Sequence, residues 1–197
     1  MGLDGMSINW EGLQIHFPFF GQHNVLNALG AITLTRKVGA HREAVKQGLE
    51  GVKPIFARSQ VIRGKVTVIE DCYNANPDSM ATVLRFFDSL PWSGRKIAVL
   101  GNMLELGEES RNAHGGIARL ALQISVERCF FFGEAWAEVR SAFRRCESDG
   151  RCFWTRKYDT LLKAVIAAVK PGDLVMLKGS RGAQLERLVD PLLKAAA

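Results

Sequence analysis

From residue 66 to residue 195, short apolar segments alternate with longer amphipathic ones. We expect strands over 66–70, 96–101, 128–132, 152–155 and 173–178, and helices over 78–89, 110–124, 134–145, 158–169 and 183–195. The central strands, IAVLG and LVMLKG, are continuous apolar runs, which is typical of strands covered on both faces. Strands that alternate with helices of this length predict βαβ units. The fold class is therefore α/β, with a mainly parallel sheet flanked by helices.

The part of the chain before this alternation follows a different pattern. We expect hairpins over 8–20 and 60–70 and helices over 22–38 and 41–50. The alternating residues of the first hairpin are interrupted by the turn pair Glu11-Gly12. The pattern changes after Pro54, so we place a domain boundary near residues 54–59. The chain then divides into domains 1–56 and 57–197.

Composition limits the classes of partner. The net charge is +6, but Lys and Arg are scattered among acidic residues, which favours a solvated surface or a site for small anions over nucleic acid. No apolar run reaches the roughly 18 residues of a membrane span, and no signal peptide precedes the first hairpin. The four cysteines form no C-x-x-C pair and show no metal-ligand spacing. We therefore expect reduced thiols, a cytoplasmic location, no bound metal and no membrane partner.

Three polar turns follow predicted strands: DCYNANPDS after 66–70, GNMLELGEES after 96–101 and KGSRG after 173–178. In an open parallel sheet, ligands bind at the carboxyl ends of the strands. These turns therefore predict a ligand crevice. The alternative is that the Asp and Asn side chains only cap the helix that begins near residue 78 and shape its turn.

Four segments together resemble the Mur ligases, the ATP-dependent amide-forming enzymes of peptidoglycan synthesis. They are GQHNVLNALGAI at 21–32, DCYNANPDSM at 71–80, VLGNMLELGEES followed by His114, and LVMLKGSRG at 174–182. The forms YNANP, MLELG and KGSR are similar to the branch that joins D-alanyl-D-alanine to a UDP-MurNAc-tripeptide. The resemblance implies a Rossmann-like C-terminal domain at 57–197. It also implies that 1–56 is the hairpin-plus-helices end of a central ATPase domain.

The resemblance implies a reaction and its cofactors. MgATP phosphorylates the terminal carboxylate of the UDP-MurNAc-tripeptide, and the amine of D-alanyl-D-alanine attacks the acyl phosphate. Such chemistry needs neutralisation of phosphoryl charge and tight positioning of two anionic reactants. The implied partners are these two substrates and the upstream domains of the ligase.

By the same resemblance, several residues would bind the nucleotide. Asn24 and Asn27 would contact adenine, because an amide offers both a donor and an acceptor. Arg58 would reach the ATP phosphates, and Asp71 would accept hydrogen bonds from the ribose hydroxyls. The remaining residues of this group would line the crevice: Tyr73, Asn74 and Asn76. Without the resemblance, a capped amphipathic start at 22–27 and a solvated linker Arg58 are the simpler interpretations.

The resemblance gives the last strand a catalytic role. Lys178, Ser180 and Arg181 would orient the dipeptide carboxylate or the peptide end of the nucleotide substrate, since cations suit carboxylates and phosphates. The alternative is a helix-capping serine beside surface cations. His114 fits helix packing or capping better than catalysis.

Two departures from the family pattern matter. The chain has no G-x-x-x-x-G-K-[ST] loop for ATP phosphates, and Asn102 stands where the family usually has Asp. We therefore expect this chain to be inactive by itself, as the C-terminal portion of a ligase. A second hypothesis is a non-catalytic nucleotide- or peptide-binding module. An exposed apolar patch at Trp10 and Phe17–Phe20 would favour the ligase portion over that module. A third hypothesis, a Rossmann-like enzyme with another cofactor, lacks the expected G-x-G-x-x-G.

Overall fold

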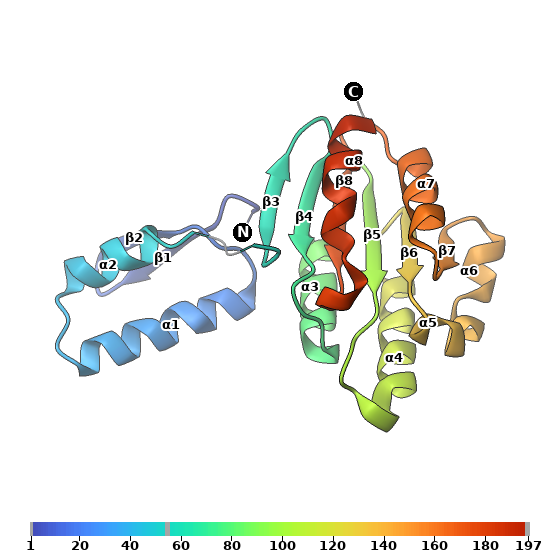
Figure 1. The fold of residues 1–197 in the computed structure, drawn as a ribbon. Coiled ribbons are helices and arrows are strands. Elements are labelled where there is room, and N and C mark those ends of the chain that lie inside the picture. The colour runs from blue at the N-terminus through green and yellow to red at the C-terminus, as the bar shows by residue number, and fades with distance from the viewer. Residues whose placement is uncertain (1, 54–55, 196–197) are drawn as a thin grey trace. The chain divides into compact units, whose positions relative to one another are not determined.

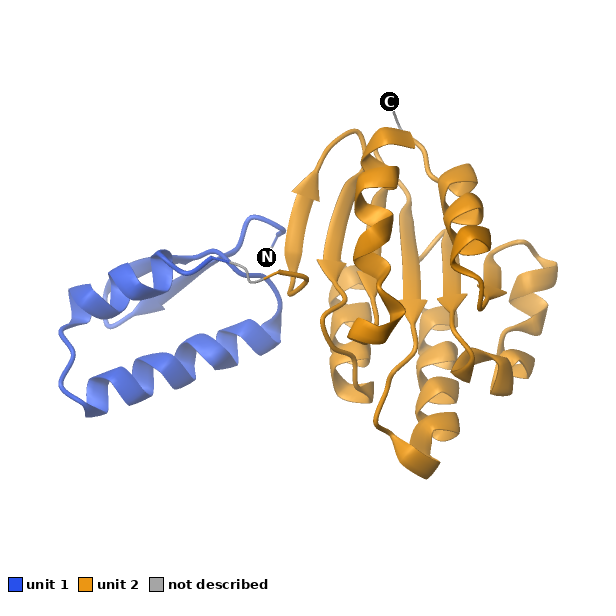
Figure 2. Cartoon of the chain, viewed as in Figure 1, with its two compact units in different colours: residues 1–55 blue, residues 56–197 orange. Residues whose placement is uncertain are grey.

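The computed structural model describes residues 2–53 and 56–195 (Figure 1). The chain forms two compact units, residues 1–55 and residues 56–197 (Figure 2). Residues 54 and 55, at the start of the expected boundary segment, lie outside the described residues.

The N-terminal unit begins with the expected hairpin. Strand β1 (Met6–Trp10) pairs antiparallel with β2 (Leu13–Phe17), and Ile8 lies opposite Ile15. Two helices follow, α1 (Gln22–Lys37) and α2 (Arg42–Glu50). The core of this unit lies between the hairpin and the helices and contains Met6, Ile15, Phe17, Ala28, Ile32, Val45 and Leu49.

The exposed apolar surface of this unit lies on helix α1 rather than at the phenylalanines that follow the hairpin. Phe17 and Phe20 are 5% and 2% exposed, so the patch that would favour the ligase portion over a binding module is not exposed at these two residues. Helix α1 instead buries a narrow stripe. Its exposed side carries large apolar residues, namely Leu26, Leu29, Leu34 and, at its end, Val38.

The second unit contains one six-stranded sheet with the order β3-β4-β8-β5-β6-β7. Its strands are β3 (Gln60–Arg63), β4 (Thr67–Asp71), β5 (Lys96–Gly101), β6 (Arg128–Phe132), β7 (Cys152–Thr155) and β8 (Leu174–Lys178). Only the edge pair β3–β4 is antiparallel, and every other neighbouring pair is parallel. The mixed α/β fold with a mainly parallel sheet is therefore confirmed.

Helices cover both faces of this sheet (Figure 1). Helices α3 (Pro77–Ser89), α4 (Ser110–Gln123), α5 (Ala135–Glu138) and α6 (Arg144–Ser148) follow β4, β5 and β6. Helices α7 (Tyr158–Ala168) and α8 (Val189–Ala195) follow β7 and β8. Right-handed crossovers place the first set on one face and α7 on the other, where the last helix, α8, packs beside α7. None of the helices in the described ranges is long and apolar enough to cross a membrane.

Two predicted helices are interrupted. The segment 134–145 forms α5, a 3₁₀ turn and α6, which lets the rings of Trp136 and Phe143 both contact Phe131, at centroid distances of 4.7 and 4.3 Å. In a continuous helix, residues seven apart would lie roughly 10 Å apart along the axis. The segment 183–195 becomes α-helical only at α8, after 3₁₀ turns, because Pro191 is tolerated in a first turn but would remove a hydrogen bond inside a longer α-helix.

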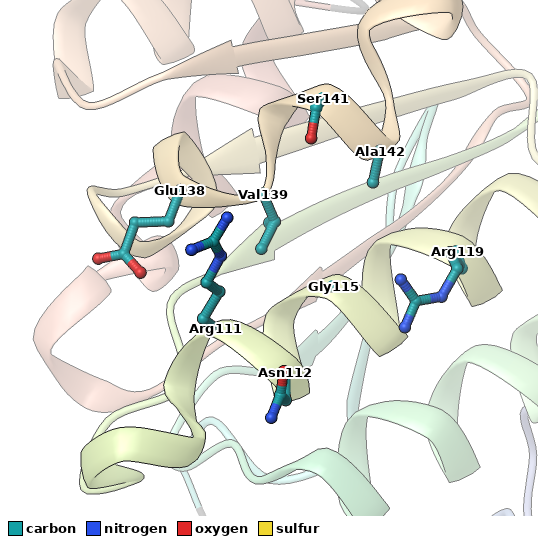
Figure 3. A pocket seen from close by; sticks show the side chains of 8 residues that line it. All are labelled: Arg111, Asn112, Gly115, Arg119, Glu138, Val139, Ser141 and Ala142. Carbon is teal, nitrogen blue, oxygen red and sulfur yellow. The ribbon is translucent and has the colours of Figure 1, made fainter.

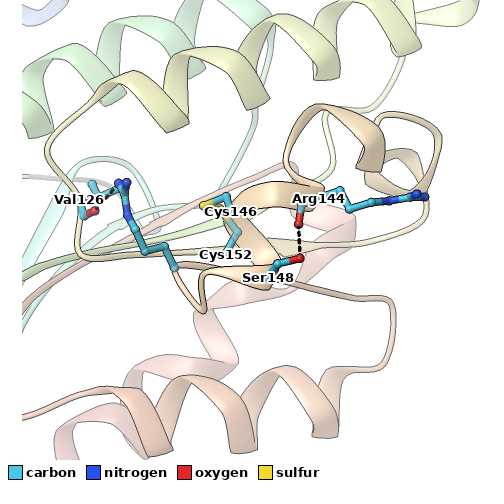
Figure 4. The surroundings of a disulfide bond; sticks show 6 residues. Val126, Arg144, Cys146, Ser148 and Cys152 are labelled. Atoms are coloured by element: carbon cyan, nitrogen blue, oxygen red, sulfur yellow. Dashed lines mark hydrogen bonds between the residues drawn. A yellow bond between two sulfur atoms is a disulfide. The ribbon is translucent and has the colours of Figure 1, made fainter.

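The cysteines differ from the expectation. Cys146 and Cys152 form a disulfide between α6 and β7, so the prediction of reduced thiols was wrong for this pair (Figure 4). Cys72 and Cys129 are free and buried. Burial raises the pKa of Cys72 to about 12, with the carboxylates of Glu70 and Glu186 adding to the effect. The two free thiols are therefore held in their neutral form.

The disulfide should contribute modestly to stability. The double variant Cys146→Ser/Cys152→Ser should lose about 2 kcal/mol of unfolding free energy, because a bridge across so short a loop removes little unfolded-chain entropy. Urea unfolding without reductant measures the loss. The parent chain with reductant is the control and should match the variant. Equal midpoints for oxidised parent and variant would show that the bridge does not stabilise the fold.

Candidate functional site

The three polar turns follow three neighbouring strands. The sheet order places β8 between β4 and β5. The chain leaves β4 and β5 toward the face of α3 and α4, and leaves β8 toward α8. Such a reversal is the topological switch point at which open α/β sheets bind ligands. We call the turns 71–76, 101–106 and 178–184 the polar edge.

An ion pair joins two strands at this edge. Asp71 and Lys178 are register partners at the ends of β4 and β8. The Lys178 Nζ lies 3.1 Å from Asp71 Oδ2, and their side chains are 2% and 15% exposed. Lys178 Nζ also donates to the Asn74 carbonyl oxygen at 2.6 Å, and Asp71 Oδ1 accepts from the Ser59 N–H at 3.1 Å. Both charges are therefore satisfied within the protein, as buried ions must be.

Ser180 connects all three turns. Its hydroxyl donates to the Ala75 carbonyl oxygen at 3.3 Å and accepts from the Leu104 N–H at 3.1 Å. Its own N–H donates to the Asn102 carbonyl oxygen at 3.0 Å. Ser180 is 3% exposed. Its present contacts therefore hold the turns together rather than face solvent.

The asparagines of the 71–76 turn organise the backbone. Asn76 Oδ1 accepts from the Ser79 N–H, and Ser79 Oγ accepts from the Asn76 N–H, which forms a capping box at the start of α3. Asn74 Oδ1 accepts from the next N–H, that of Ala75, at 2.8 Å. The capping and turn-shaping interpretation is thus correct for these two oxygens. Asp71 does not cap α3 and pairs with Lys178 instead.

Two arginines beside the edge lie over aromatic rings. The Arg58 guanidinium lies 4.3 Å from the Tyr73 ring centroid, and the Tyr73 N–H donates to the carbonyl oxygen of Ala57. Arg181 lies 5.0 Å from the Phe56 ring centroid, and its side chain is 54% exposed. Arg181 is thus the member of the predicted catalytic set that reaches solvent.

Two acidic residues, Glu186 and Glu70, interact with Arg181. Its Nη1 pairs with Glu186 Oε1 at 3.1 Å, and Cys72 Sγ lies 3.8 Å from Glu186 Oε2. Burial raises the pKa of Glu70, and the Glu186 carboxylate raises it further, while Arg181 opposes the shift. Sequence reasoning missed Glu186, because only the fold of the two 3₁₀ turns before α8 brings it back to Arg181.

His114 holds the loop after β5. Its Nε2 accepts from the Met103 N–H at 3.0 Å, so the ring proton is on Nδ1, which donates to the Ser110 carbonyl oxygen at 2.7 Å. Burial lowers the pKa of this fully buried ring, which keeps it neutral. Trp136 packs edge-on against it, with a centroid distance of 4.8 Å. These contacts confirm the packing interpretation of His114.

Asn102 lies against a glycine of the next strand end. Gly133 has a φ of +119°, and a Cβ on it would be 2.4 Å from Asn102 Oδ1. That oxygen is buried and has no hydrogen-bond partner within residues 2–53 and 56–195. A buried acceptor without a donor is unfavourable. The Asp that the resemblance leads us to expect here would carry a full charge, which costs more to bury than a neutral amide.

The predicted adenine contacts lie in the N-terminal unit. Asn24 is 9% exposed, and its Nδ2 donates to the Phe20 carbonyl oxygen at 2.8 Å. Asn27 Nδ2 donates to Asn24 Oδ1 at 3.2 Å. Asn24 therefore uses both ends of its amide to organise the start of α1, and Asn27 is the more exposed of the two.

The polar edge keeps hydrogen-bond acceptors that its internal contacts do not use. The Asp71 carboxylate has about four lone-pair sites, of which the contacts above use two, so it retains acceptors for hydroxyl groups. No group of three or more His, Cys, Asp or Glu residues that could hold a metal ion occurs in the described parts of the chain. The edge thus combines carboxylate acceptors with guanidinium donors.

Comparison with known proteins identifies relatives of the chain. Residues 57–181 match the family model "Mur ligase, glutamate ligase domain". The chain is 36% identical over 193 residues to the UDP-N-acetylmuramoyl-tripeptide–D-alanyl-D-alanine ligase of Treponema pallidum (strain Nichols), covering 98% of the chain and 42% of that protein. It is 34% identical over 197 residues to the ligase of the same name from Bacillus subtilis (strain 168), covering 98% of the chain and 43% of that protein. The chain thus spans less than half the length of these relatives.

Solved structures give the same assignment. A crystal structure of MurF from Acinetobacter baumannii superposes with a TM-score of 0.80 at 25% identity, covering 92% of this chain and 40% of that one. MurF of Thermotoga maritima, solved in complex with ADP, has the same fold, with a TM-score of 0.77 at 22% identity, and covers 96% of this chain and 43% of that one. The family model alone covers more than half of the chain. The chain therefore belongs to the Mur ligase family.

Proposed function

We propose that this chain supplies the C-terminal part of an ATP-dependent ligase that joins D-alanyl-D-alanine to a UDP-MurNAc-tripeptide through an acyl phosphate. The similarity to ligases of that name over nearly the whole chain carries this proposal. Residues 57–197 are its C-terminal domain, and residues 1–56 are the end of its central ATP-binding domain. The convergence of three polar turns at one sheet edge supports a substrate site there.

The residues of the polar edge divide into two roles. Arg181 and Arg58 are the charged groups that meet the anionic reactants, since each guanidinium lies over an aromatic ring and offers several donors. Lys178 and Ser180 position the turns, because their contacts are internal. Asp71 accepts from the ribose hydroxyls, and Tyr73, Asn74 and Asn76 line the nucleotide side. Asn27, the more exposed of the two asparagines in the first unit, contacts adenine, and Asn24 orients it through the hydrogen bond between their amides.

MgATP supplies the phosphoryl group that activates the tripeptide carboxylate. The chain offers sugar and anion contacts but no phosphate loop, so the upstream domains of the ligase hold the triphosphate and the metal. Phosphates contribute much of nucleotide affinity, so the chain by itself should bind ATP only in the range of about 1 mM. A tight, magnesium-dependent ATP complex would contradict this division of labour.

Phosphate release tests the proposal. The chain is incubated with MgATP, UDP-MurNAc-tripeptide and D-alanyl-D-alanine, first alone and then with an N-terminal fragment of a related ligase that carries the phosphate loop. We expect no release by the chain alone and release on mixing. Arg181→Gln should lower the rate in the mixture at least about tenfold, because it removes a charged donor.

A matched control separates catalysis from charge. Arg85 is an exposed residue of α3, and Arg85→Gln should leave the rate in the mixture unchanged. Release by the chain alone would show that other residues hold the phosphates. The N-terminal fragment must be shown to be active when it is combined with its own C-terminal part. If it is, no phosphate release in either incubation would favour the non-catalytic binding module.

A further inference from the structure

A pocket outside the polar edge lies between α4 and the segment 138–142 (Figure 3). Its volume is about 190 Å³, and it is lined by Arg111, Asn112, Gly115, Arg119, Glu138, Val139, Ser141 and Ala142. Pockets for drug-sized ligands span roughly 300–1,000 Å³, so this one suits a molecule of amino-acid size. None of its residues belongs to the three turns of the polar edge.

The charges of the pocket are available to a ligand. In the part of the chain that the structure describes, the side chains of Arg111, Arg119 and Glu138 form no hydrogen bond or ion pair. Arg111 and Arg119 stand eight residues apart on one helix, so their Cα atoms are roughly 12 Å apart along its axis. Figure 3 shows Arg111 near Glu138 at one end of the pocket and Arg119 toward the other. Asn112 and Ser141 add neutral hydrogen-bonding groups between them.

Gly115 keeps the floor of the pocket open. Glycine is among the least favourable residues in a helix interior, and α4 has two in succession, Gly115 and Gly116. A Cβ on Gly115 would lie 3.6 Å from Arg119 Nη1 and 3.6 Å from Val139 Cγ1, which are ordinary contacts. Packing therefore does not require glycine at 115. The missing side chain instead leaves space between Arg119 and Val139.

The charge pattern selects one class of ligand. Two separated guanidinium groups match two carboxylates, and the single acid, Glu138, matches one ammonium group. We propose that this pocket binds a small acidic amino acid, with its two carboxylates on Arg111 and Arg119 and its ammonium group on Glu138. The inference does not depend on the proposed ligase function, because the pocket and its contacts lie within this chain.

Titrations of the isotopically labelled chain test the ligand class. Glutamate, glutarate and alanine are added at constant ionic strength, and the amide signals of Gly115 and Gly116 are followed by NMR. We expect glutamate to bind with a dissociation constant of about 1 mM. Glutarate, without the ammonium group, and alanine, without the second carboxylate, should each bind at least about fivefold more weakly. Equal affinities for glutamate and glutarate would overturn the proposal. So would an unchanged Gly115 amide signal at glutamate concentrations far above about 1 mM.

Charge variants test the assigned contacts. Arg111→Gln and Arg119→Gln should each weaken glutamate binding about tenfold, and Glu138→Gln should abolish the preference for glutamate over glutarate. Arg181→Gln at the polar edge should leave the binding unchanged. Loss of binding in Arg181→Gln with retention in Arg111→Gln would place glutamate at the polar edge and refute the pocket.

A pair of glycine variants separates binding from folding. Gly115→Ala should raise the melting temperature by improving helix propensity and weaken glutamate binding by filling the pocket. Gly116→Ala, where a Cβ has no neighbour within 4 Å, should raise the melting temperature and leave binding unchanged. Equal glutamate affinities in the two variants would show that the space at Gly115 does not serve the ligand.

Discussion

Lys178→Met should lower the free energy of unfolding by about 3 kcal/mol, although methionine nearly matches the length of the lysine side chain. The substitution leaves the Asp71 carboxylate, which is 15% exposed, without its cation. It also leaves the Asn74 carbonyl oxygen without its donor. Removal of one partner of a buried ion pair typically costs 3–5 kcal/mol, because the other charge stays buried. Urea unfolding followed by circular dichroism measures the change.

A double-mutant cycle separates the ion pair from the loss of a lysine. Asp71→Asn in the Lys178→Met background should cost less than Asp71→Asn in the parent chain, because the carboxylate has already lost its cation there and the substitution removes an unpaired charge. Lys163→Met on α7 is the matched control, since Lys163 is exposed, and should change the stability by less than about 0.5 kcal/mol. If Lys178→Met is as stable as this control, the pair does not hold β4 and β8 together at their ends.

Gly133→Ala should also cost about 3 kcal/mol, for two separable reasons. The backbone at Gly133 has a φ of +119°, which side-chain-bearing residues rarely adopt, and a new Cβ would collide with the Asn102 amide. Thermal and urea unfolding of the variant give the total cost. The collision also displaces Asn102, whose carbonyl oxygen accepts the Ser180 N–H, so the loop after β5 should exchange its amide hydrogens faster.

Two companions divide the cost of Gly133→Ala. Asn102→Ala in the same chain removes the collision and should recover part of the loss. Gly150→Ala serves as the control for backbone strain, because its φ is +73° and a Cβ there would meet nothing within 4 Å; it should cost about 1 kcal/mol. A Gly133→Ala loss no greater than that of Gly150→Ala would mean that Asn102 moves aside freely.

Much of the fold follows from local pattern. Apolar runs such as 96–101 and 173–178 are too short for helices and too apolar for exposed strands, so they predict the buried parallel sheet that the structure contains. The wrong predictions concern two helices. The segments 134–145 and 183–195 have helical composition, but ring packing around Phe131 and the position of Pro191 interrupt them. Propensity is a weak guide where tertiary contacts compete with it.

The site divides in the same way. The sequence by itself determined that three polar turns follow predicted strands and that Asn76 is suited to cap a helix, because both depend on neighbours within a few residues. Only the tertiary structure decided that β8 lies between β4 and β5, that Lys178 is enclosed by Asp71 and Asn74, and that Cys146 and Cys152 are bridged. It also decided that Glu186 returns to Arg181 and that a pocket opens beside Gly115. The physical reason is that strand order, burial and charge pairing depend on residues distant along the chain, which no local pattern specifies.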